Sequence, residues 1–352
     1  MQKNIVKKGL VIAVIFLFIA VSFQPVFADD NIKKTSVPVS DGNVLYVGGS
    51  GPGNYSRIQD AINASSDGDT VFVYDDSSPY VENVVVNTSI SLIGEEKNST
   101  IIDGGANGNG VNLTSDNTVI IGFTITNCSN GTAVCISSNN SIVSDNIITH
   151  NNIGIIPYFD NPFEGDFVGI GNNTIKNNLI ISNGLGIGLS GENNTVNGNI
   201  ISQSEVGLEI VLSLSNNISN NLISENEYGI LILTSYDSMI YMNNISQNEK
   251  LGVLIFCTSS DKIIQNNFIV NGQNAYFSQP IISRVRTLKK LLDIPIKKSL
   301  WNGNFWDRSR LMPYIIPGLI SLIRVPSFEP PFNHNILQFD WYPAKEPYDI
   351  GV

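Results

Sequence analysis

Asparagines recur at nearly even spacing through the middle of this chain, and this spacing constrains the fold more than any other feature. They are Asn146, Asn178, Asn199, Asn221, Asn244 and Asn267, separated by steps of 32, 21, 22, 23 and 23 residues. A second column keeps similar steps: Gly154, Gly186, Gly207, Gly229, Gly252 and then Ala275. Two residue types that repeat in register at one period indicate a solenoid, in which each repeat forms one coil.

The pattern within each repeat indicates the kind of coil. Apolar residues alternate over stretches of three to five residues, which is typical of strands, and no helical period persists across a repeat. Repeats of about 22 residues, with turns rich in Asn, Gly and Ser, fit three strands per coil of a parallel β-helix. We therefore predict an all-β solenoid.

The repeated asparagines and glycines have structural roles in such a fold. On successive coils, equivalent asparagines lie about 4.8 Å apart, so each side-chain amide can hydrogen-bond to its neighbours in a buried row. The column glycines are expected to supply a positive φ angle at a second turn. None of these asparagines is a candidate catalytic residue.

The first 28 residues have the pattern of an export signal. Lys3, Lys7 and Lys8 precede an apolar run from Leu10 to Val21, and Val26-Phe27-Ala28 resembles a small-residue cleavage site. We expect a signal peptide at 1–28, a linker at 29–45 and no membrane span in the mature chain. An uncleaved anchor is the alternative. The mature protein is then expected outside the cell or at its surface, where exposed N-x-S/T sequons could carry glycan.

Charge limits the kinds of partner. Without the three signal lysines the chain has 17 basic and 31 acidic residues, and this acidic balance argues against nucleic acid as a partner. Glu205, Glu227 and Lys250 each stand two residues before a column glycine. We interpret them as a surface charge ladder in which Lys250 offsets Glu227.

The cysteine content excludes a disulfide-built fold. Cys128, Cys135 and Cys257 allow at most one intramolecular disulfide. Cys128 and Cys135 could pair across a turn or could be small apolar fillers of the core.

A short helix is expected to cover the N-terminal end of the solenoid, between Tyr55 and Ala64. Ser56 and Gln59 have the spacing of a capping box. Ile58, Ala61 and Ile62 share one helical face.

At this point the chain resembles a known group of proteins. The motifs I-Q-x-A-I, G-D-T-V, Y-x-E-N, L-I-G and I-I-D-G follow one another between Ile58 and Gly104. Their order resembles the opening of right-handed parallel β-helix proteins of the pectin-lyase-like superfamily. Within it, the chain especially resembles the NosD-like and carbohydrate-binding or sugar-hydrolase β-helix repeat group of secreted archaeal and bacterial proteins. The resemblance spans roughly Tyr46 to Pro280 and implies the fold only, since this scaffold hosts lyases, hydrolases, epimerases, esterases and non-catalytic surface proteins.

The C-terminal part is expected to differ from the coils. We predict the β-helix at 46–280 and, at 281–352, a tail that packs on the last coils. The outward positions turn apolar there, at Leu231, Leu233, Leu254 and Phe256, and an apolar outer face needs a cover. The expected cover residues are Trp301, Phe305, Trp306 and Trp341. An oligomer interface on this face is the alternative.

The chemistry of the known enzymes on this scaffold is not apparent in the sequence. Residues 101–280 contain no arginine to act as a lyase base, and neither an aspartate cluster with a G-H-G motif nor a D-P-H motif occurs. His150 and His334 are the only histidines, and they are far apart in sequence, so the NosD resemblance does not imply a copper site here. We predict no catalytic residue and no obligatory cofactor.

One insertion breaks the repeat, in the long step between Asn146 and Asn178. Residues 157–166 combine aromatic rings, which can stack on sugars, with carboxylates, which can bind sugar hydroxyls or calcium. The candidate ligand-binding residues are Tyr158, Phe159 and Phe163. The candidate calcium ligands are Asp160, Glu164 and Asp166. The alternative is a loop whose rings pack on the coil and whose acids are solvated.

These observations favour a secreted or cell-surface protein that binds a polysaccharide or another cell-envelope glycan without catalysis. The alternative is a polysaccharide-modifying enzyme with an unrecognised active site. A third reading is a purely structural envelope module.

Overall fold

The computed structural model of the protein describes residues 42–157, 170–256, 260–283, 299–308, 312–324 and 332–351. They belong to one compact unit, Thr35–Val352. The expected signal at 1–28 and most of the expected linker at 29–45 lie outside the described residues. Within the described ranges, no helix is both long and apolar enough to cross a membrane.

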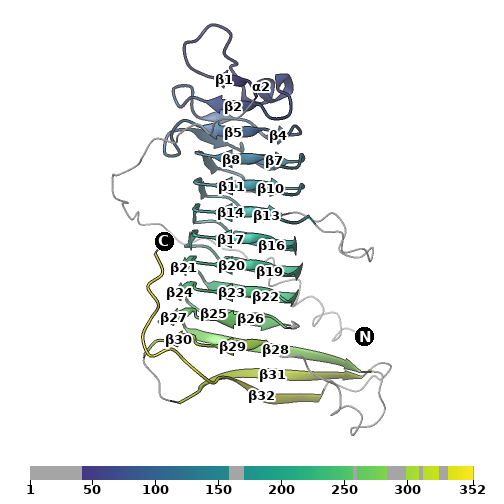
Figure 1. Ribbon diagram of the computed structural model, residues 1–352, viewed down its shortest axis with the longest axis vertical. Helices are drawn as coiled ribbons and strands as arrows, with labels where there is room; N and C mark the ends of the chain where they lie inside the picture. Colours follow the sequence, from purple (N-terminus) through teal and green to yellow (C-terminus); the bar gives the residue numbers. More distant parts are fainter. Residues whose placement is uncertain are drawn as a thin grey trace. The chain divides into compact units, whose positions relative to one another are not determined.

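Short strands in three sheets make up nearly all of the regular structure (Figure 1). Each coil contributes one strand to sheet A, then one to sheet B, then one to sheet C, and each strand pairs in parallel with its equivalent on the next coil. The predicted all-β parallel β-helix is confirmed.

The strand bounds follow the order of the coils. Sheet A contains β1 (Val44–Val47), β2 (Thr70–Val73), β5 (Ser91–Gly94), β8 (Val119–Ile121), β11 (Ile142–Ser144), β14 (Thr174–Lys176), β17 (Thr195–Asn197), β20 (Asn217–Ser219), β23 (Met239–Tyr241), β26 (Lys262–Ile264) and β29 (Leu300–Asn302). Sheet B contains β3 (Tyr80–Val81), β6 (Ile101–Asp103), β9 (Thr124–Thr126), β12 (Ile147–Thr149), β15 (Leu179–Ile181), β18 (Ile200–Ser202), β21 (Leu222–Ser224), β24 (Asn244–Ser246), β27 (Asn267–Ile269) and β30 (Phe305–Trp306). Sheet C contains β4 (Val84–Val86), β7 (Val111–Leu113), β10 (Thr132–Ile136), β13 (Ile153–Pro157), β16 (Leu185–Glu192), β19 (Val206–Leu214), β22 (Tyr228–Tyr236), β25 (Leu251–Phe256), β28 (Gln273–Ser283), β31 (Tyr314–Arg324) and β32 (Phe332–Asp340).

The core is a continuous column of inward-facing aliphatic side chains. In most three-residue strands the middle residue points inward and is fully buried, as Val143 of β11 and Ile148 of β12 show. Burying a side chain of this size stabilises the fold by about 1.5–3 kcal/mol. The repetition of this contribution on every coil explains why the chain needs no disulfide framework.

A ladder of asparagine side chains runs through the turn between sheets A and B. Asn178 Oδ1 accepts hydrogen bonds from the backbone N–H and the side-chain amide of Asn146, at 3.0 and 3.1 Å. The same arrangement links Asn146, Asn178, Asn199, Asn221, Asn243, Asn266 and Asn304. The predicted membership of Asn244 and Asn267 is wrong by one residue, because these two asparagines begin strands β24 and β27.

The residue before each ladder position adopts the left-handed conformation that turns the chain. Asp145, Asn177 and Asn220 have φ angles of 55°, 54° and 54°. Asparagine and aspartate tolerate this region better than most residues, which explains their abundance at the turns. Matching ladders occupy the other two turns, for example from Asn173 to Asn194 and from Asn226 to Asn248.

The column glycines have a different role from the one we predicted. Gly154, Gly186, Gly207, Gly229 and Gly252 lie inside sheet C strands, and none has a positive φ angle. A Cβ atom on Gly186 would lie 2.5 Å from the carbonyl oxygen of Gly207 on the next coil. Glycine is therefore required by the close approach of neighbouring coils.

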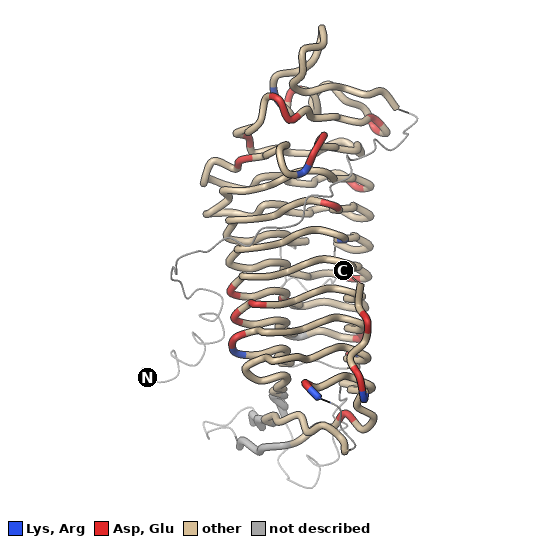
Figure 2. Tube along the Cα trace, turned by 90° about the vertical axis from the view of Figure 1, so that its left-hand side faces the viewer, with Lys and Arg blue, Asp and Glu red and all other residues tan. Residues whose placement is uncertain are grey.

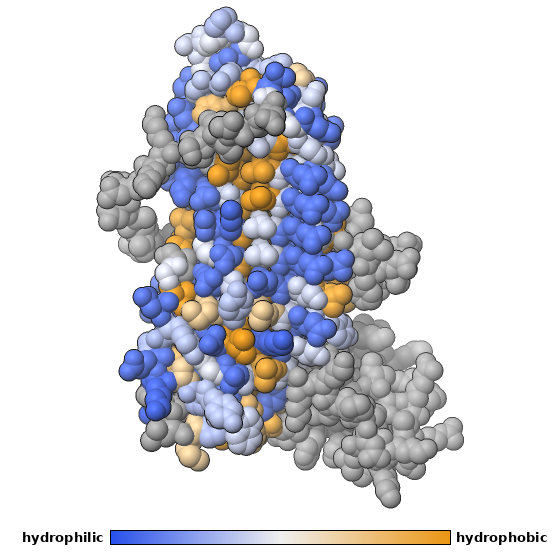
Figure 3. All heavy atoms as spheres, viewed as in Figure 1, coloured by the Kyte–Doolittle hydropathy of each residue, from blue (hydrophilic) through white to orange (hydrophobic). Residues whose placement is uncertain are grey.

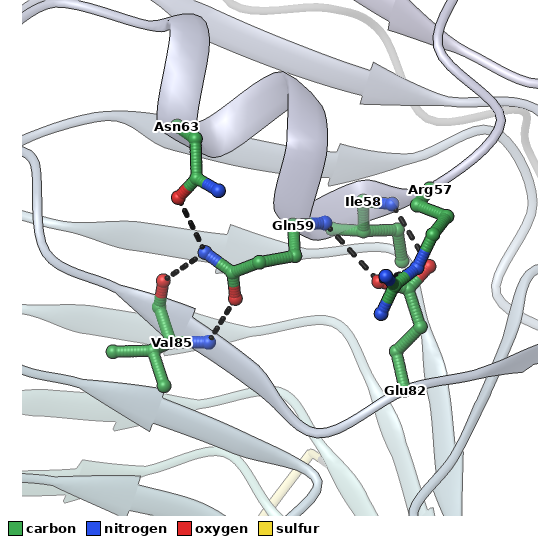
Figure 4. Close-up of polar contacts among 6 residues, drawn as sticks. All are labelled: Arg57, Ile58, Gln59, Asn63, Glu82 and Val85. Carbon is green, nitrogen blue, oxygen red and sulfur yellow. Dashed lines mark hydrogen bonds and ion pairs between the residues drawn. The ribbon is translucent and has the colours of Figure 1, made fainter.

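Helix α2 (Ile58–Ala64) covers the N-terminal end of the core, as predicted, and buries Ile58, Ala61 and Ile62. The predicted capping box is wrong, since the N-cap residue is Arg57 and it makes no side-chain capping bond. Figure 4 shows that Glu82, in the turn between β3 and β4, caps the helix instead. Its two carboxylate oxygens accept hydrogen bonds from the backbone N–H groups of Ile58 and Gln59, at 2.9 and 3.2 Å.

Gln59 protects the exposed edge of sheet C at the same end. Its side-chain amide donates to the carbonyl of Val85 at 3.1 Å and accepts from the Val85 N–H at 2.8 Å (Figure 4). The amide thus replaces the missing neighbour of edge strand β4, which limits edge-to-edge association.

At the C-terminal end the solenoid continues beyond residue 280. Strand β28 runs through the expected boundary, and Trp301 and Trp306 lie in β29 and β30 of a further coil. The predicted position of Trp301, Phe305 and Trp306 over the outer face is therefore wrong. These rings are buried at the end of the coil stack, where Trp306 lies between Phe268 and Tyr314 at centroid distances of 4.4 and 3.9 Å.

The last residues wrap back over the coils, in agreement with the predicted tail. The Tyr348 N–H donates to Asn267 Oδ1, and Asn267 Nδ2 donates to the Tyr348 carbonyl, both at 2.9 Å. Strand β32, which precedes this segment, pairs antiparallel with β31 and ends sheet C among the described residues. Trp341 is 62% exposed and packs on Phe339, with ring centroids 5.0 Å apart.

The surface reflects the repeat. Figure 3 shows hydrophilic columns that run along the stack beside narrower apolar ones. Figure 2 shows acidic residues at the turns of many coils and few basic residues along the described trace.

Candidate functional site

A groove lies beside the first coils, where β1, β2 and β5 end. Its volume is roughly 660 Å³. It is lined by Tyr46, Gly49, Ser50, Gly51, Pro52, Asn54, Tyr74, Asp75, Asp76 and Glu95. The lining combines aromatic rings, a glycine-rich loop and carboxylates.

The aromatic wall results from the register between β1 and β2. Tyr46 pairs with Phe72, and both face outward because Val47 and Val73 take the buried positions. Tyr74 follows at the next outward position. The rings of Tyr46 and Tyr74 stack with centroids 5.9 Å apart and an interplanar angle of 22°, and Phe72 meets Tyr74 edge-on at 5.2 Å.

Tyr80 fixes the position of Tyr74 from below. The buried Tyr80 hydroxyl donates to the Tyr74 carbonyl at 2.7 Å. Burial raises the pKa of Tyr80 to about 12, so the hydroxyl keeps its proton at neutral pH and remains a donor.

The loop at residues 48–54, between β1 and α2, contributes Gly49, Ser50, Gly51, Pro52 and Asn54 to the lining. The Gly49 N–H donates to Asp76 Oδ1 at 2.9 Å, and Asn54 Nδ2 donates to the Gly48 carbonyl at 2.6 Å. Gly48 has a φ of 73°, and a Cβ atom there would lie 2.4 Å from the Tyr80 hydroxyl. The loop is therefore held in one conformation against the aromatic wall.

Three carboxylates line the groove, and each is anchored through one oxygen. Asp76 Oδ1 accepts from the Gly49 N–H and from Ser77 Oγ. Asp75 Oδ2 accepts from Ser99 Oγ at 2.6 Å, and Glu95 Oε2 accepts from the Asp75 N–H at 3.3 Å. The second oxygen of each carboxylate accepts no hydrogen bond from the part of the chain that the structure describes.

The residues predicted as a site lie elsewhere. Tyr158, Phe159, Asp160, Phe163, Glu164 and Asp166 are outside the described residues, so their roles stay predictions. The insertion leaves β13 at Pro157, whose carbonyl accepts from Ser190 Oγ at 2.6 Å. It therefore interrupts the connection from sheet C to sheet A, whereas the groove follows the ends of sheet A strands on the first coils.

The predicted charge ladder is confirmed. Lys250 forms an ion pair with Glu227, and its ammonium lies 5.1 Å from the centre of the Tyr228 ring. The hydrogen bond that Lys250 donates to Glu227 raises the pKa of Lys250, whereas burial and the charge of Glu227 raise the pKa of Glu205. The positive charge of Lys250 thus offsets the stacked negative charges of Glu205 and Glu227 on the surface.

Sequence reasoning missed the groove. The Asp75-Asp76 pair is visible in the sequence, but its aromatic neighbours Tyr46 and Tyr74 are 28 residues apart. The signal in the sequence is that aromatic residues alternate with valine within Tyr46-Val47 and within Phe72-Val73-Tyr74. This alternation places the rings on the outward side of two paired strands.

Comparisons with known proteins agree with the fold. Residues 165–310 match the family model NosD, described as a periplasmic copper-binding protein. Similar solved structures include pectate lyase Pel9A, with a TM-score of 0.51, 16% identity, and coverage of 75% of this chain and 80% of that chain. The A-module of the Azotobacter vinelandii mannuronan C-5 epimerase AlgE4 has a TM-score of 0.49 and 14% identity, with coverage of 76% of this chain and 83% of that chain. DFA-IIIase from Arthrobacter chlorophenolicus A6 has a TM-score of 0.49 and 11% identity, with coverage of 81% of this chain and 89% of that chain. No curated protein matches the sequence.

The described residues do not fit the copper site that the family description implies. They contain no group of three or more His, Cys, Asp or Glu side chains placed to hold a metal ion. His150 lies at an exposed turn with Nδ1 2.9 Å from Thr149 Oγ1. Cys128 carries a free thiol, which rules out its pairing with Cys135, and burial raises its pKa to about 11. A thiol that keeps its proton is a poor metal ligand.

Proposed function

We propose that this parallel β-helix protein, whose residues 165–310 match the NosD family model, acts as an exported, non-catalytic binding protein for a polysaccharide or another envelope glycan. The groove at the first coils is the proposed binding site. The observation that carries the proposal is the Tyr46–Tyr74 stack in the lining of a groove that also contains three carboxylates. One oxygen of each carboxylate accepts no hydrogen bond from the described residues.

The chemistry of this lining suits a sugar. The apolar face of a pyranose ring packs against aromatic rings, and its hydroxyls donate to carboxylate oxygens. Tyr46 is 41% exposed, which leaves surface available for stacking. The hydrogen bonds that anchor each carboxylate fix its second oxygen in place before a ligand arrives, and such preorganisation reduces the entropic cost of binding.

Binding without turnover agrees with the form of the groove. Each carboxylate is held as a hydrogen-bond acceptor, and no histidine, lysine or arginine belongs to its described lining. A polysaccharide-modifying enzyme is the alternative function, and turnover of any bound glycan by the purified protein would support it.

The test is a glycan-array screen of the protein without residues 1–28, with and without calcium, followed by titration of the best ligand. Tyr46→Ala should weaken binding at least tenfold, because the exposed half of the stack is lost. Tyr236→Ala is the matched control, since Tyr236 is 44% exposed on β22, outside the groove. Equal affinities for the two variants, at unchanged melting temperatures, would disprove the groove as the site.

A further inference from the structure

The charge of the groove specifies the class of sugar that it accepts. We propose that the groove selects saccharides that carry free amino groups over neutral sugars, and that it excludes uronates. This inference rests on the proposed function, because it concerns the ligand of the same groove.

The cavity and the aromatic stack define where the ring of a sugar lies. The stacked rings of Tyr46 and Tyr74 line the groove together with residues of the loop at 48–54. Asp75, Asp76 and Glu95 are the charged residues of the lining, so a sugar ring stacked on Tyr46 shares the groove with three carboxylates. A ring substituent in the groove therefore meets carboxylates.

The carboxylate oxygens that accept no hydrogen bond from the described residues favour a cationic ligand. One oxygen each of Asp75, Asp76 and Glu95 is engaged by the N–H and O–H donors described above, and the other accepts nothing from the described residues. A protonated amine has three donors and one positive charge, and hydrogen bonds between ionised partners are stronger than neutral ones. A hydroxyl offers one donor and no charge.

The same geometry disfavours an acidic sugar. A uronate carboxylate has no proton to donate at neutral pH, so it cannot satisfy these acceptors and is repelled by their charge. No lysine or arginine occurs among the described lining residues to offset this repulsion. The net charge of −11 on the whole chain acts in the same direction at longer range.

The experiment compares four oligosaccharides of equal length by calorimetric titration: β-1,4-linked glucosamine, N-acetylglucosamine, glucose and an α-1,4-linked galacturonate. The glucosamine oligomer should bind about tenfold more tightly than the acetylated one, and the galacturonate should not bind. Raising salt from 0.05 to 0.5 M should weaken only the glucosamine oligomer, because ion pairs are screened and stacking is not.

Variants assign the effect to the groove. Asp76→Asn and Glu95→Gln keep the anchoring acceptor and remove one charge, so each should lower glucosamine affinity roughly two- to fivefold and leave neutral binding unchanged. Asp237→Asn, at an exposed turn after β22, removes one charge outside the groove and should have no effect.

The outcomes separate the two proposals. Equal binding of the glucosamine and glucose oligomers, or preference for galacturonate, overturns the charge selectivity while the groove remains a sugar site. Loss of all binding in Tyr46→Ala together with equal effects of Asp76→Asn and Asp237→Asn also overturns it. Failure of all four oligomers to bind contradicts this inference and, with an empty glycan array, the proposed function.

Discussion

Asn221 Oδ1 accepts hydrogen bonds from both the backbone N–H and the side-chain amide of Asn199, on the preceding coil, at 2.9 and 3.0 Å. Asn221 in turn donates its N–H and its amide to Asn243 on the next coil. The amide also donates to the carbonyls of Val196 and Ser219 at 2.9 Å. One side chain therefore satisfies the backbone of its own turn and those of its neighbours, in a place that water does not reach.

The first prediction concerns this ladder. Asn221→Ala should lower the free energy of unfolding by about 2–4 kcal/mol, because the buried Asn199 N–H loses its acceptor and two carbonyls lose a donor. Chemical denaturation of the purified protein measures the loss. Asn244→Ala is the matched control, since the buried Asn244 Oδ1 has no hydrogen-bond partner among the described residues. Its cost should stay below about 1 kcal/mol. A larger cost for Asn244→Ala than for Asn221→Ala would contradict the assigned register.

The sequence predicts the ladder but not its register at every coil, for a physical reason. In Asn243-Asn244 and Asn266-Asn267 either asparagine fits the period, and only the backbone decides between them. Met242 has a φ of 53°, so the turn is completed one residue earlier than the asparagine spacing suggests. Steric tolerance favours asparagine in the left-handed region but does not forbid methionine, so composition alone could not place that turn.

The second prediction concerns the N-terminal cap. Glu82→Ala should destabilise the protein by about 1–3 kcal/mol, because the N–H groups of Ile58 and Gln59 lose their acceptors. Arg57 also loses the Glu82 carboxylate, which lies 3.7 Å from its Nε. Hydrogen exchange at these two amides should accelerate with it. Ser56→Ala tests the sequence-based capping box at an exposed position and should change neither quantity. If Ser56→Ala lowered the free energy of unfolding as much as Glu82→Ala, the result would support the capping box that the sequence predicted.

The third prediction concerns the C-terminal end. Trp306→Ala should lower the free energy of unfolding by about 3–5 kcal/mol, since a fully buried ring is removed from between Phe268 and Tyr314. Its Nε1 also donates to the buried Asp340 Oδ2 at 3.0 Å, which then loses a donor. Trp341→Ala removes a ring that is 62% exposed and should cost less than about 1 kcal/mol. Denaturant titration of the two variants side by side distinguishes an end cap from a surface cover, because a surface cover predicts similar losses.

The candidate site was less accessible to sequence reasoning than the fold. The pattern of a repeat recurs many times in the sequence and is therefore easy to detect. The groove occurs once and joins residues from the ends of three strands. Tyr46 and Phe72 lie in strands β1 and β2, and Tyr74 directly follows β2. Their stacking depends on the pairing of Tyr46 with Phe72, and the strand register is set by the buried valines on the other face. Similarly, the carboxylate of Glu82 could be recognised as a helix cap only after the turn between β3 and β4 was placed beside the start of α2.

The last prediction concerns Glu209, a carboxylate on the outward face of sheet C. It stands in register between Gly188 of β16 and Leu231 of β22, so neither neighbour offers a polar group from its side chain. Burial raises the pKa of Glu209 above its ordinary value of 4.5. The native state therefore binds this proton more readily than the unfolded state, and the stability of the protein falls as pH rises through the native pKa. At neutral pH the partly buried charge opposes folding.

Glu209→Gln should therefore stabilise the protein at pH 7.5, with a rise in Tm of roughly 1–3 °C, because the amide has no charge to desolvate. The difference between the variant and the original protein should shrink as pH is lowered and should vanish near pH 4.5, where the native carboxyl is protonated in the original protein as well. Melting curves at half-unit steps from pH 4 to pH 8 measure this convergence. Glu249→Gln, at an exposed turn, is the control for the replacement of one surface carboxylate. A Glu209→Gln variant that is less stable at pH 7.5 would show that the carboxylate has a stabilising partner and that its charge favours the native state.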